Sequence, residues 1–298
     1  MVLVAASPAA RPQAAAGGDP GRVAWRELRY KAHKWLLGAA TTTRLELVPA
    51  GSVTLREAPG QEGVLPSGPR VGRLDTFTDL PFGRAEEAVT WFDPGTGAAL
   101  QYEKRLSGRK PALRAGRYTV SGLYVWRADP ARRDEADRPP ERWSKRREGH
   151  VSPQPPLPAG ARLVDSYALL YLVSAARLEP GEELQLLTIS RERLVELRLV
   201  AVRPGERKVD YDELRGSDVR RRAGPLAVVP VEVSARPAGG APAGPEIDLA
   251  FMGLRGALTV FVEPATGVPV AIVGRAEGVG EVTVRLDRVT LADGPAAR

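Results

Sequence analysis

The chain has 298 residues, of which 43% are hydrophobic and 27% are charged, with 31 glycines and 27 prolines. This length suits one large β-domain or two smaller domains, and the many turn residues argue against a helical bundle. The absence of cysteine excludes disulfides, thiolate metal sites and cysteine nucleophiles. The net charge is +7, yet residues 132–150 carry seven Lys/Arg beside five Asp/Glu, so a nucleic-acid partner is not expected.

The first 22 residues have no periodic pattern and lie outside the expected core. The apolar run Val2-Leu3-Val4-Ala5-Ala6 and the small-residue stretch Ala14-Ala15-Ala16 resemble parts of a signal peptide, but a positively charged start is missing. We favour a signal peptide whose true start lies upstream of Met1, with a disordered tail as the alternative. Residues 23–292 are expected to form a single β-domain, exported or periplasmic. No apolar window approaches the roughly 18 residues of a membrane-spanning helix, so an integral membrane protein is not expected.

Two similar turn phrases divide the predicted strands. Asp93-Pro94-Gly95-Thr96-Gly97 and Glu263-Pro264-Ala265-Thr266-Gly267 combine an acidic acceptor, a proline and a late glycine, which is hairpin-turn chemistry. Before the first phrase we expect two strands in residues 25–48, a loop-rich stretch at 49–84 and a strand at 85–92. After it, Leu100, Tyr102 and Leu106 share one parity of a strand at 98–106.

The middle of the chain shows one long alternation and one helix. Tyr118, Val120, Tyr124 and Trp126 are expected on one side of a strand, with the polar residues between them on the other. Residues 128–161 hold seven prolines and many charges, so they are read as a surface loop or hinge joining halves 23–127 and 162–292. Residues 163–177 predict the helix, capped by Asp165 or Ser166.

Alternating strands return after the helix. Leu197 and Leu199 alternate with charged residues, and Val229, Val231 and Val233 do the same around residue 230. Residues 236–246 predict a loop, and a meander ends the chain, with Val282, Val284 and Leu286 alternating in its last strand. About ten to thirteen strands and one helix favour a mainly β fold, a curved antiparallel sheet or incomplete β-barrel with one helix packed on it.

Several of these phrases resemble a known family. Phe92-Asp93-Pro94-Gly95-Thr96-Gly97, followed by Tyr102-Glu103-Lys104-Arg105 and Ser107-Gly108-Arg109-Lys110-Pro111, is similar to the central block of domain-of-unknown-function 3108. The likeness extends from Trp25-Arg26-Glu27-Leu28-Arg29-Tyr30 to the closing meander. It implies an exported protein of mostly Gram-negative bacteria, and it transfers no catalytic residues. The chain departs from the family in its weak N-terminal signal, its charged loop at 128–161 and its insertion at 236–246.

Motifs for catalysis are scarce. Neither a nucleophile elbow nor a phosphate-binding loop occurs, and the two histidines, His33 and His150, are interpreted as structural and solvated. The carboxylates Asp210, Asp212 and Glu213 are the best candidates for a metal or acid–base site, because hard cations favour oxygen ligands. A turn whose acids pair with Lys208, Arg215 and Arg220 is the favoured alternative. No cofactor is expected.

One constellation fits binding better than catalysis. The strands around the first turn phrase carry aromatic residues with basic residues nearby in sequence: Trp91, Tyr102, Tyr118, Tyr124, Trp126, Arg105, Arg109, Lys110 and Arg114. On a curved sheet the aromatics would line an apolar groove, and the basic residues would hold an anionic head group at its mouth. Ordinary core and surface is the competing interpretation.

The resulting prediction is a non-enzymatic protein that binds or carries a hydrophobic or amphiphilic, lipid-like molecule of the cell envelope. The alternative is a structural or interaction module in envelope assembly that recruits a partner strand at a sheet edge, and a metal-dependent hydrolase ranks third. A hollow apolar cavity in the structure would support the binding function, whereas a solid core would exclude it.

Overall fold

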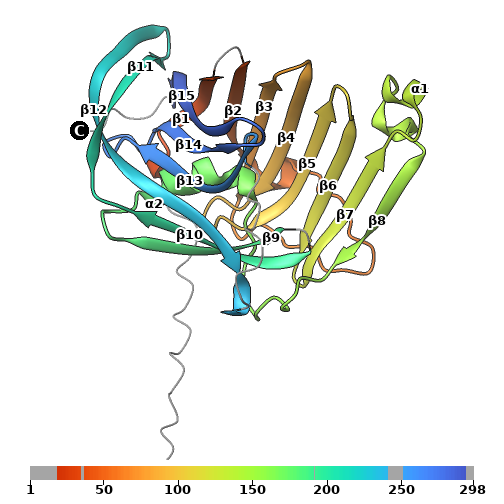
Figure 1. Ribbon diagram of the computed structural model, residues 1–298. Helices are drawn as coiled ribbons and strands as arrows, with labels where there is room; N and C mark the ends of the chain where they lie inside the picture. The colour runs from red at the N-terminus through yellow and green to blue at the C-terminus, as the bar shows by residue number, and fades with distance from the viewer. Residues whose placement is uncertain (1–18, 35–36, 191, 241–250, 293–298) are drawn as a thin grey trace, which may run out of the picture.

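A curved sheet of 15 strands makes up most of the molecule (Figure 1). The computed structural model describes residues 19–34, 37–190, 192–240 and 251–292. The strands are β1 (Trp25–Lys34), β2 (Leu37–Pro49), β3 (Arg70–Leu80), β4 (Arg84–Phe92), β5 (Ala99–Ser107), β6 (Ala112–Thr119), β7 (Gly122–Asp129), β8 (Lys145–Val151), β9 (Glu183–Ser190), β10 (Arg193–Ala201), β11 (Gly205–Arg215), β12 (Asp218–Pro237), β13 (Leu254–Val262), β14 (Pro269–Ala276) and β15 (Gly280–Leu291).

Strands β1 to β8 form an antiparallel meander in which each strand pairs with the next. Beyond β1 the sheet continues through β15, β14, β13 and β12, and then through β10 to its other edge at β9. The fold is thus one antiparallel sheet whose first and last thirds meet where β1 pairs with β15.

Strand β12 closes part of the sheet into a ring. Its first half pairs with β11, and its second half pairs with β13 on one side and β10 on the other. Strand β11 returns to β15 in parallel, matching Asp212 to Arg288 and Leu214 to Thr290. Strands β11 to β15 therefore close on themselves, while β1 to β8 fan out as an open curved sheet (Figure 1). The expected curved antiparallel sheet is confirmed, although the closure is not that of a regular barrel.

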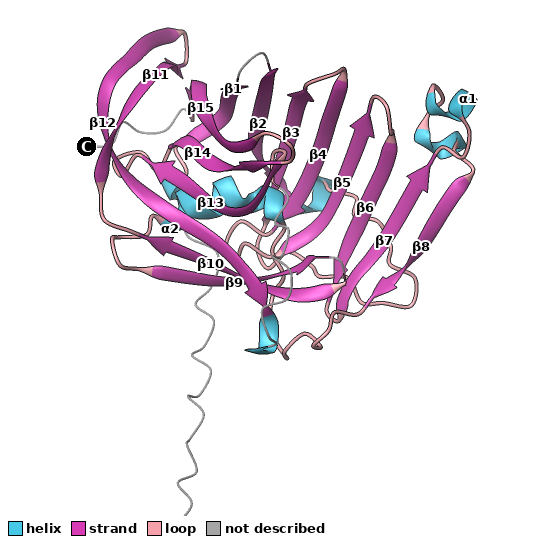
Figure 2. Cartoon of the chain, viewed as in Figure 1, coloured by secondary structure: helices cyan, strands magenta, loops and turns pink. Residues whose placement is uncertain are grey.

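The two α-helices of the described residues are α1 (Arg133–Ala136) and α2 (Leu169–Ala176) (Figure 2). Short 3-10 turns occupy Pro20–Arg22, Ala50–Ser52, Pro140–Arg142, Ser166–Ala168 and Ala238–Gly240. None of the helices in the described part of the chain has the length and apolar character needed to cross a membrane.

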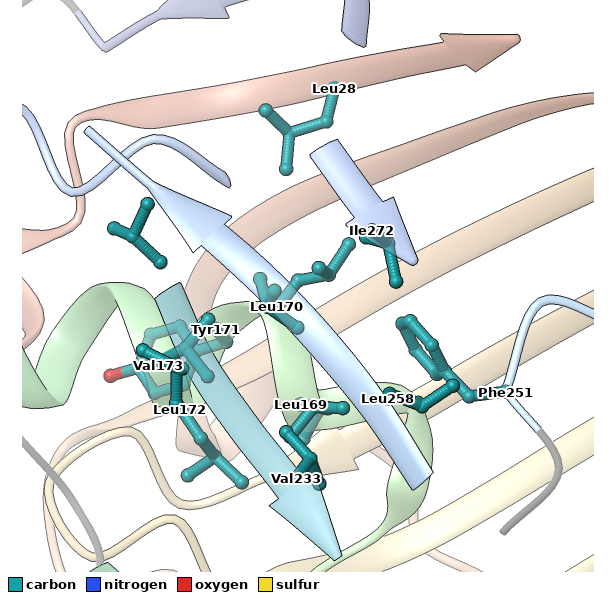
Figure 3. Close-up of a cluster of buried hydrophobic side chains, with 14 of the residues drawn as sticks. Leu28, Leu169, Leu170, Tyr171, Leu172, Val173, Val233, Phe251, Leu258 and Ile272 are labelled. Carbon is teal, nitrogen blue, oxygen red and sulfur yellow. The ribbon is translucent and has the colours of Figure 1, made fainter. Parts of the chain in front are cut away.

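Helix α2 lies inside the curve of the sheet. Figure 3 shows Leu169 and Leu170 among Val233 of β12, Leu258 of β13 and Ile272 of β14. Every residue from Leu169 to Ala175 is buried, so the helix is apolar on all sides and is held by packing. The helix predicted at 163–177 is present over the shorter range of α2, and Asp165 caps the 3-10 turn Ser166–Ala168 that leads into it, where its carboxylate accepts a 2.8 Å hydrogen bond from the Tyr167 amide.

Both turn phrases form the same hairpin turn, and both contact α2. In each, the late glycine amide donates to the acidic residue's carbonyl at 2.8 Å, and that glycine has φ of 71°. The hydroxyl of Tyr171 donates to Pro94 O at 2.6 Å, and the Arg177 guanidinium donates to Thr266 O at 3.1 Å. The duplicated phrase therefore fixes α2 at two equivalent points of the sheet.

Three expectations from the sequence are wrong. Residues 49–84 contain β3, whose buried face carries two threonines beside Leu74: Thr76 and Thr78 bond the hydroxyls of Thr43 and Thr41. Residues 128–161 contain α1 and β8, and the first four residues of the edge strand β8, Lys145 to Glu148, are charged. Residues 117–127 are two strands joined by a tight turn, since Thr119 pairs with Gly122.

Two further expectations fall wholly or partly outside the described residues. The N-terminal segment is described only from residue 19, where Asp19 caps the turn Pro20–Arg22. The loop expected at 236–246 is described only to residue 240. There Arg236 and Pro237 still belong to β12, and Arg236 forms a 2.6 Å ion pair with Glu196.

Candidate ligand-binding pocket

A pocket of about 410 Å³ lies between the inner face of the meander and the ring. One wall is apolar and comes from β1, β2, β14 and β15, with Ala32, Ala39, Ala276, Val282 and Val284. A tight turn at 251–254 forms a second wall through Phe251, Met252 and Leu254. The volume and the apolar lining are typical of small-molecule sites.

The opposite wall carries three polar side chains in mutual contact. Lys104 of β5 forms a 2.7 Å ion pair with Glu86 of β4 and donates a 2.8 Å hydrogen bond to the hydroxyl of Tyr167. That hydroxyl in turn donates to Glu86. Burial, and then the Glu86 charge, raise the pKa of Tyr167 well above its usual value, so the phenol stays a neutral donor. Lys104 and Glu86 compensate each other's charge, which makes this wall polar without net charge.

Deeper in the same layer, a buried carboxylate supports Tyr167. Asp165 is 6% exposed and accepts hydrogen bonds from Tyr118 at 2.7 Å and from Thr90 at 3.3 Å. Burial raises the pKa of Asp165, and these hydrogen bonds offset part of that rise. Burial also raises the pKa of Tyr102, beside Tyr118, to about 12. The tyrosines around Asp165 are therefore protonated at neutral pH.

Two turns with unusual backbone border the pocket. Phe82 and Met252 have φ of 67° and 52°, a left-handed conformation that costs a non-glycine residue about 1–2 kcal/mol. Residues 251–254 form a two-residue hairpin, with amide-to-carbonyl bonds of 3.0 and 2.9 Å between Phe251 and Leu254. Residues with strained backbone cluster at functional sites, so the two strained turns support this pocket as the candidate functional site.

A second hollow of about 500 Å³ adjoins the pocket and shares Leu80, Arg84 and Leu106 with it. Arg109 and Lys110, from the turn between β5 and β6, complete its basic side. All three cations are exposed, and within the described residues none of them has an ion-pair partner. This basic hollow offers unpaired positive charge next to an apolar pocket.

The structure divides the predicted aromatic groove between two faces of the sheet. Directly paired residues share a face, so Tyr102 and Tyr118 face α2, whereas Trp91, Tyr124 and Trp126 lie on the outer face. The prediction treated 117–127 as one strand, and the turn between β6 and β7 reverses the parity. None of these five residues lines the pocket.

The outer face is covered near Trp126 by the segment that precedes β3. The Arg56 guanidinium lies 5.6 Å from the Trp126 ring centroid, and the Arg56 amide donates to Gln101 at 2.7 Å. Of the predicted basic residues, Arg109 and Lys110 lie in the basic hollow. Arg105 is exposed on the outer face, and Arg114 is held by Asp129 at 2.7 Å.

The predicted carboxylate cluster lies on β11 and is engaged by arginines. Arg221 contacts Asp210 at 2.7 Å and Asp212 at 2.9 Å, and Arg222 lies 3.3 Å from Glu213. The antiparallel pairing of β12 with β11 brings Arg221 and Arg222 to these carboxylates, in place of the Lys208, Arg215 and Arg220 expected from the sequence. Searched over the described residues, the chain holds no group of three or more His, Cys, Asp or Glu side chains suited to a metal ion.

The histidines lie apart from the pocket. His33 is exposed on β1, and His150 lies on β8 with its ring near the hydroxyls of Thr119 and Ser152 at 3.1 and 3.2 Å. Partial burial lowers the pKa of His150. The expectation that His150 lies in a loop is therefore wrong, because the residue belongs to β8, where it pairs with Tyr124 of β7 and is half-buried.

The polar wall was missed, although the sequence carries a signal for it. Leu100, Tyr102 and Leu106 share the inner parity of β5, and Lys104 lies on that same parity. A charged residue on an otherwise apolar face needs a buried partner, which here is Glu86 on the inner face of β4. Tyr167 could not be placed this way, because it comes from a distant segment.

No family model, no curated protein and no solved structure matches the chain. The resemblance to domain-of-unknown-function 3108 stays a prediction.

Proposed function

We propose that the protein binds a small amphiphilic molecule without transforming it. The observation that carries the proposal is the mainly apolar pocket of about 410 Å³ that adjoins a hollow with three unpaired cations. The apolar part of the ligand would lie against Val282 and Val284, and an acidic head group would lie near Arg84, Arg109 and Lys110. The expected exported location rests on the family resemblance and belongs to the same proposal.

The polar wall adds a second requirement for the ligand. The ammonium of Lys104 has three donor hydrogens, and Glu86 and Tyr167 accept two of them. The third donor favours a ligand with a neutral acceptor, such as a carbonyl or hydroxyl, along its apolar body. A second carboxylate is disfavoured there because Glu86 already compensates the charge of Lys104.

The other two functions have less support. A partner strand would have to add at one of the two sheet edges, β8 or β9. Strand β8 carries Lys145, Arg146 and Arg147, the kind of residues that oppose strand addition. The free side of β9 is partly occupied, because the Val164 amide donates to Leu187 O at 2.7 Å. A hydrolase at Asp210 and Asp212 would need carboxylates free of their arginine partners.

The test is equilibrium binding of an anilinonaphthalene sulfonate, a probe with apolar rings and one anionic group. Ala276→Phe places a ring inside the pocket and should weaken binding at least about tenfold, since the lost contact area is that of a large side chain. Val120→Phe, at an exposed position in the turn between β6 and β7 and outside the pocket lining, is the size-matched control. Equal binding by wild type and Ala276→Phe would refute the proposal.

The head-group site is tested separately with charge variants. Arg84→Ser and Arg109→Ser should weaken the sulfonate probe several-fold and leave an uncharged naphthalene probe unaffected. Arg147→Ser, which removes an exposed charge from β8, is the control. A uniform loss for both probes would mean that the arginines act on the fold and not on the head group.

A further inference from the structure

The most exposed aromatic side chain among the described residues is Phe82, at the mouth of the pocket. It is 85% exposed in the turn between β3 and β4, and its φ of 67° is unfavourable for a phenylalanine. Because the Phe82 ring is almost fully exposed, it contributes little packing energy to the fold. A single exposed apolar residue is common on protein surfaces, but Phe82 combines 85% exposure with a strained turn and a place at the mouth of a mainly apolar pocket.

The surroundings of Phe82 are basic. Arg84 follows it by two residues, and Arg109 and Lys110 belong to the neighbouring turn between β5 and β6. The two turns are in contact, since a Cβ at Gly108 would lie 2.6 Å from Gly83 O. Asp79 is exposed on the outer face of β3, opposite to the pocket side taken by Leu80. Phe82, Arg84, Arg109 and Lys110 thus form one end of the sheet, named here the docking end.

We propose that the docking end binds the surface of an anionic lipid bilayer, with Phe82 inserted among the head groups and the three cations on lipid phosphates. The inference rests on the proposed function, because it sets the mouth of the pocket against the phase in which amphiphiles reside. A single projecting ring with three cations needs no complementary surface on its partner. A bilayer satisfies this condition, whereas a protein partner requires a larger matched area.

The expected binding is weak and reversible. Each cation near an anionic membrane contributes roughly a fivefold gain in affinity, and one inserted aromatic ring contributes roughly tenfold or more. The electrostatic part weakens with ionic strength because salt shortens the range of the surface potential. The protein should therefore move between membrane and solution.

The test is co-sedimentation of the full chain with phospholipid vesicles. Phosphatidylcholine vesicles are compared with the same vesicles containing phosphatidylglycerol, at low and high salt. We expect binding only with phosphatidylglycerol, weaker at high salt, about tenfold weaker for Phe82→Ser and roughly fivefold weaker for Arg109→Ser. Leu65→Ser, at a position 73% exposed, and Arg147→Ser are the matched controls and should bind like wild type.

The outcomes separate this inference from the proposed function. Absence of binding, equal binding to both vesicle types, or equal losses in the control variants would overturn the docking end. Binding to an acidic polypeptide without binding to vesicles would also overturn it and assign the patch to a protein partner. Ala276→Phe should lose the sulfonate probe and keep vesicle binding. Probe binding without vesicle binding would retain the proposed function and reject this inference alone.

Discussion

Tyr118 donates a 2.7 Å hydrogen bond to the buried carboxylate of Asp165 and thereby ties β6 to the cap of the turn before α2. The same carboxylate accepts the Tyr167 amide, and the Tyr167 hydroxyl bonds to Lys104 and Glu86. Asp165 and Tyr167 therefore connect β6, through the capped turn before α2, to the polar wall of the pocket.

This relationship predicts an unusual pH dependence of stability. The pKa of Asp165 is raised in the folded protein, so between its usual value of 3.8 and that raised value the folded state binds more protons than the unfolded state. The contribution of Asp165 to the free energy of unfolding is then largest below 3.8 and falls as the pH rises through the folded pKa. Asp165→Asn keeps a capping oxygen and cannot ionise.

The measurement is the free energy of unfolding by urea for both proteins over a series of pH values. We expect the stability of Asp165→Asn relative to wild type to increase as the pH rises above about 3.8 and then to level off. Taking the difference removes the contribution of the other carboxylates. A relative stability that is constant or decreasing with pH would contradict a raised pKa.

The second turn phrase predicts a specific cost for a single methyl group. At Gly267, with φ of 71°, a Cβ would lie 3.1 Å from Ser174 O and 3.2 Å from Arg177 Nε. Gly267→Ala should therefore cost the left-handed strain of about 1–2 kcal/mol and a further ~1 kcal/mol for displacing the end of α2. Gly278→Ala is the matched control, since its φ is 73° with no atom within 4 Å of the added Cβ.

Chemical denaturation of the two alanine variants gives the comparison directly. A larger loss at Gly267 means that the turn supports the helix, as the bond from Arg177 to Thr266 O indicates. Equal losses in the free energy of unfolding at the two positions would show that the end of α2 can move to accommodate the added methyl group without a measurable loss of stability.

The arginine partners of the β11 carboxylates predict that calcium has no effect on stability. Asp212 lies 2.9 Å from Arg221 and 3.6 Å from Arg288, and its hydrogen bond with Arg221 is the main cause of its lowered pKa. Added calcium should leave the melting temperature of wild type and of the Asp210→Ala, Asp212→Ala double variant unchanged. A calcium-dependent rise in wild type that disappears in the double variant would restore the metal-site hypothesis.

The sequence predicted the elements that rest on local patterns and missed those that rest on pairing between distant segments. Helix α2 and the two hairpin turns follow from capping and turn residues within a few positions, and the structure contains them. Strand β3 was missed because Thr76 and Thr78 are polar, and their buried partners on β2 are more than 30 residues away.

The pocket illustrates the same limit. The alternation through Tyr118 and Tyr124 was assigned to one strand, because Val120, the first of the two turn residues, continues the apolar alternation and the turn signal of Ser121-Gly122 was overlooked. Arg109 and Lys110 were correctly placed next to one another, yet the apolar wall that they adjoin comes from β14 and β15, more than 160 residues further along the chain. Only the pairing of β1 with β15 in the folded chain brings this apolar wall next to Arg109 and Lys110.

The last prediction concerns the stability cost of Phe82. Its left-handed backbone is unfavourable, and at 85% exposure its ring contributes little packing. Asparagine tolerates this conformation better, so Phe82→Asn should raise the free energy of unfolding by roughly 1 kcal/mol. Phe77→Asn is the control on the same hairpin, 45% exposed within β3, and should lower stability by up to about 1 kcal/mol because asparagine is a poor strand former.

Urea denaturation of the two variants, with vesicle co-sedimentation on the same samples, connects this cost to function. A more stable Phe82→Asn that no longer binds anionic vesicles means that the residue is kept for binding at the expense of stability. A Phe82→Asn variant that is less stable than wild type would show that the ring packs on the turn. In that case the strain at Phe82 would be a feature of the fold, and the docking end would lose one of its two supporting observations.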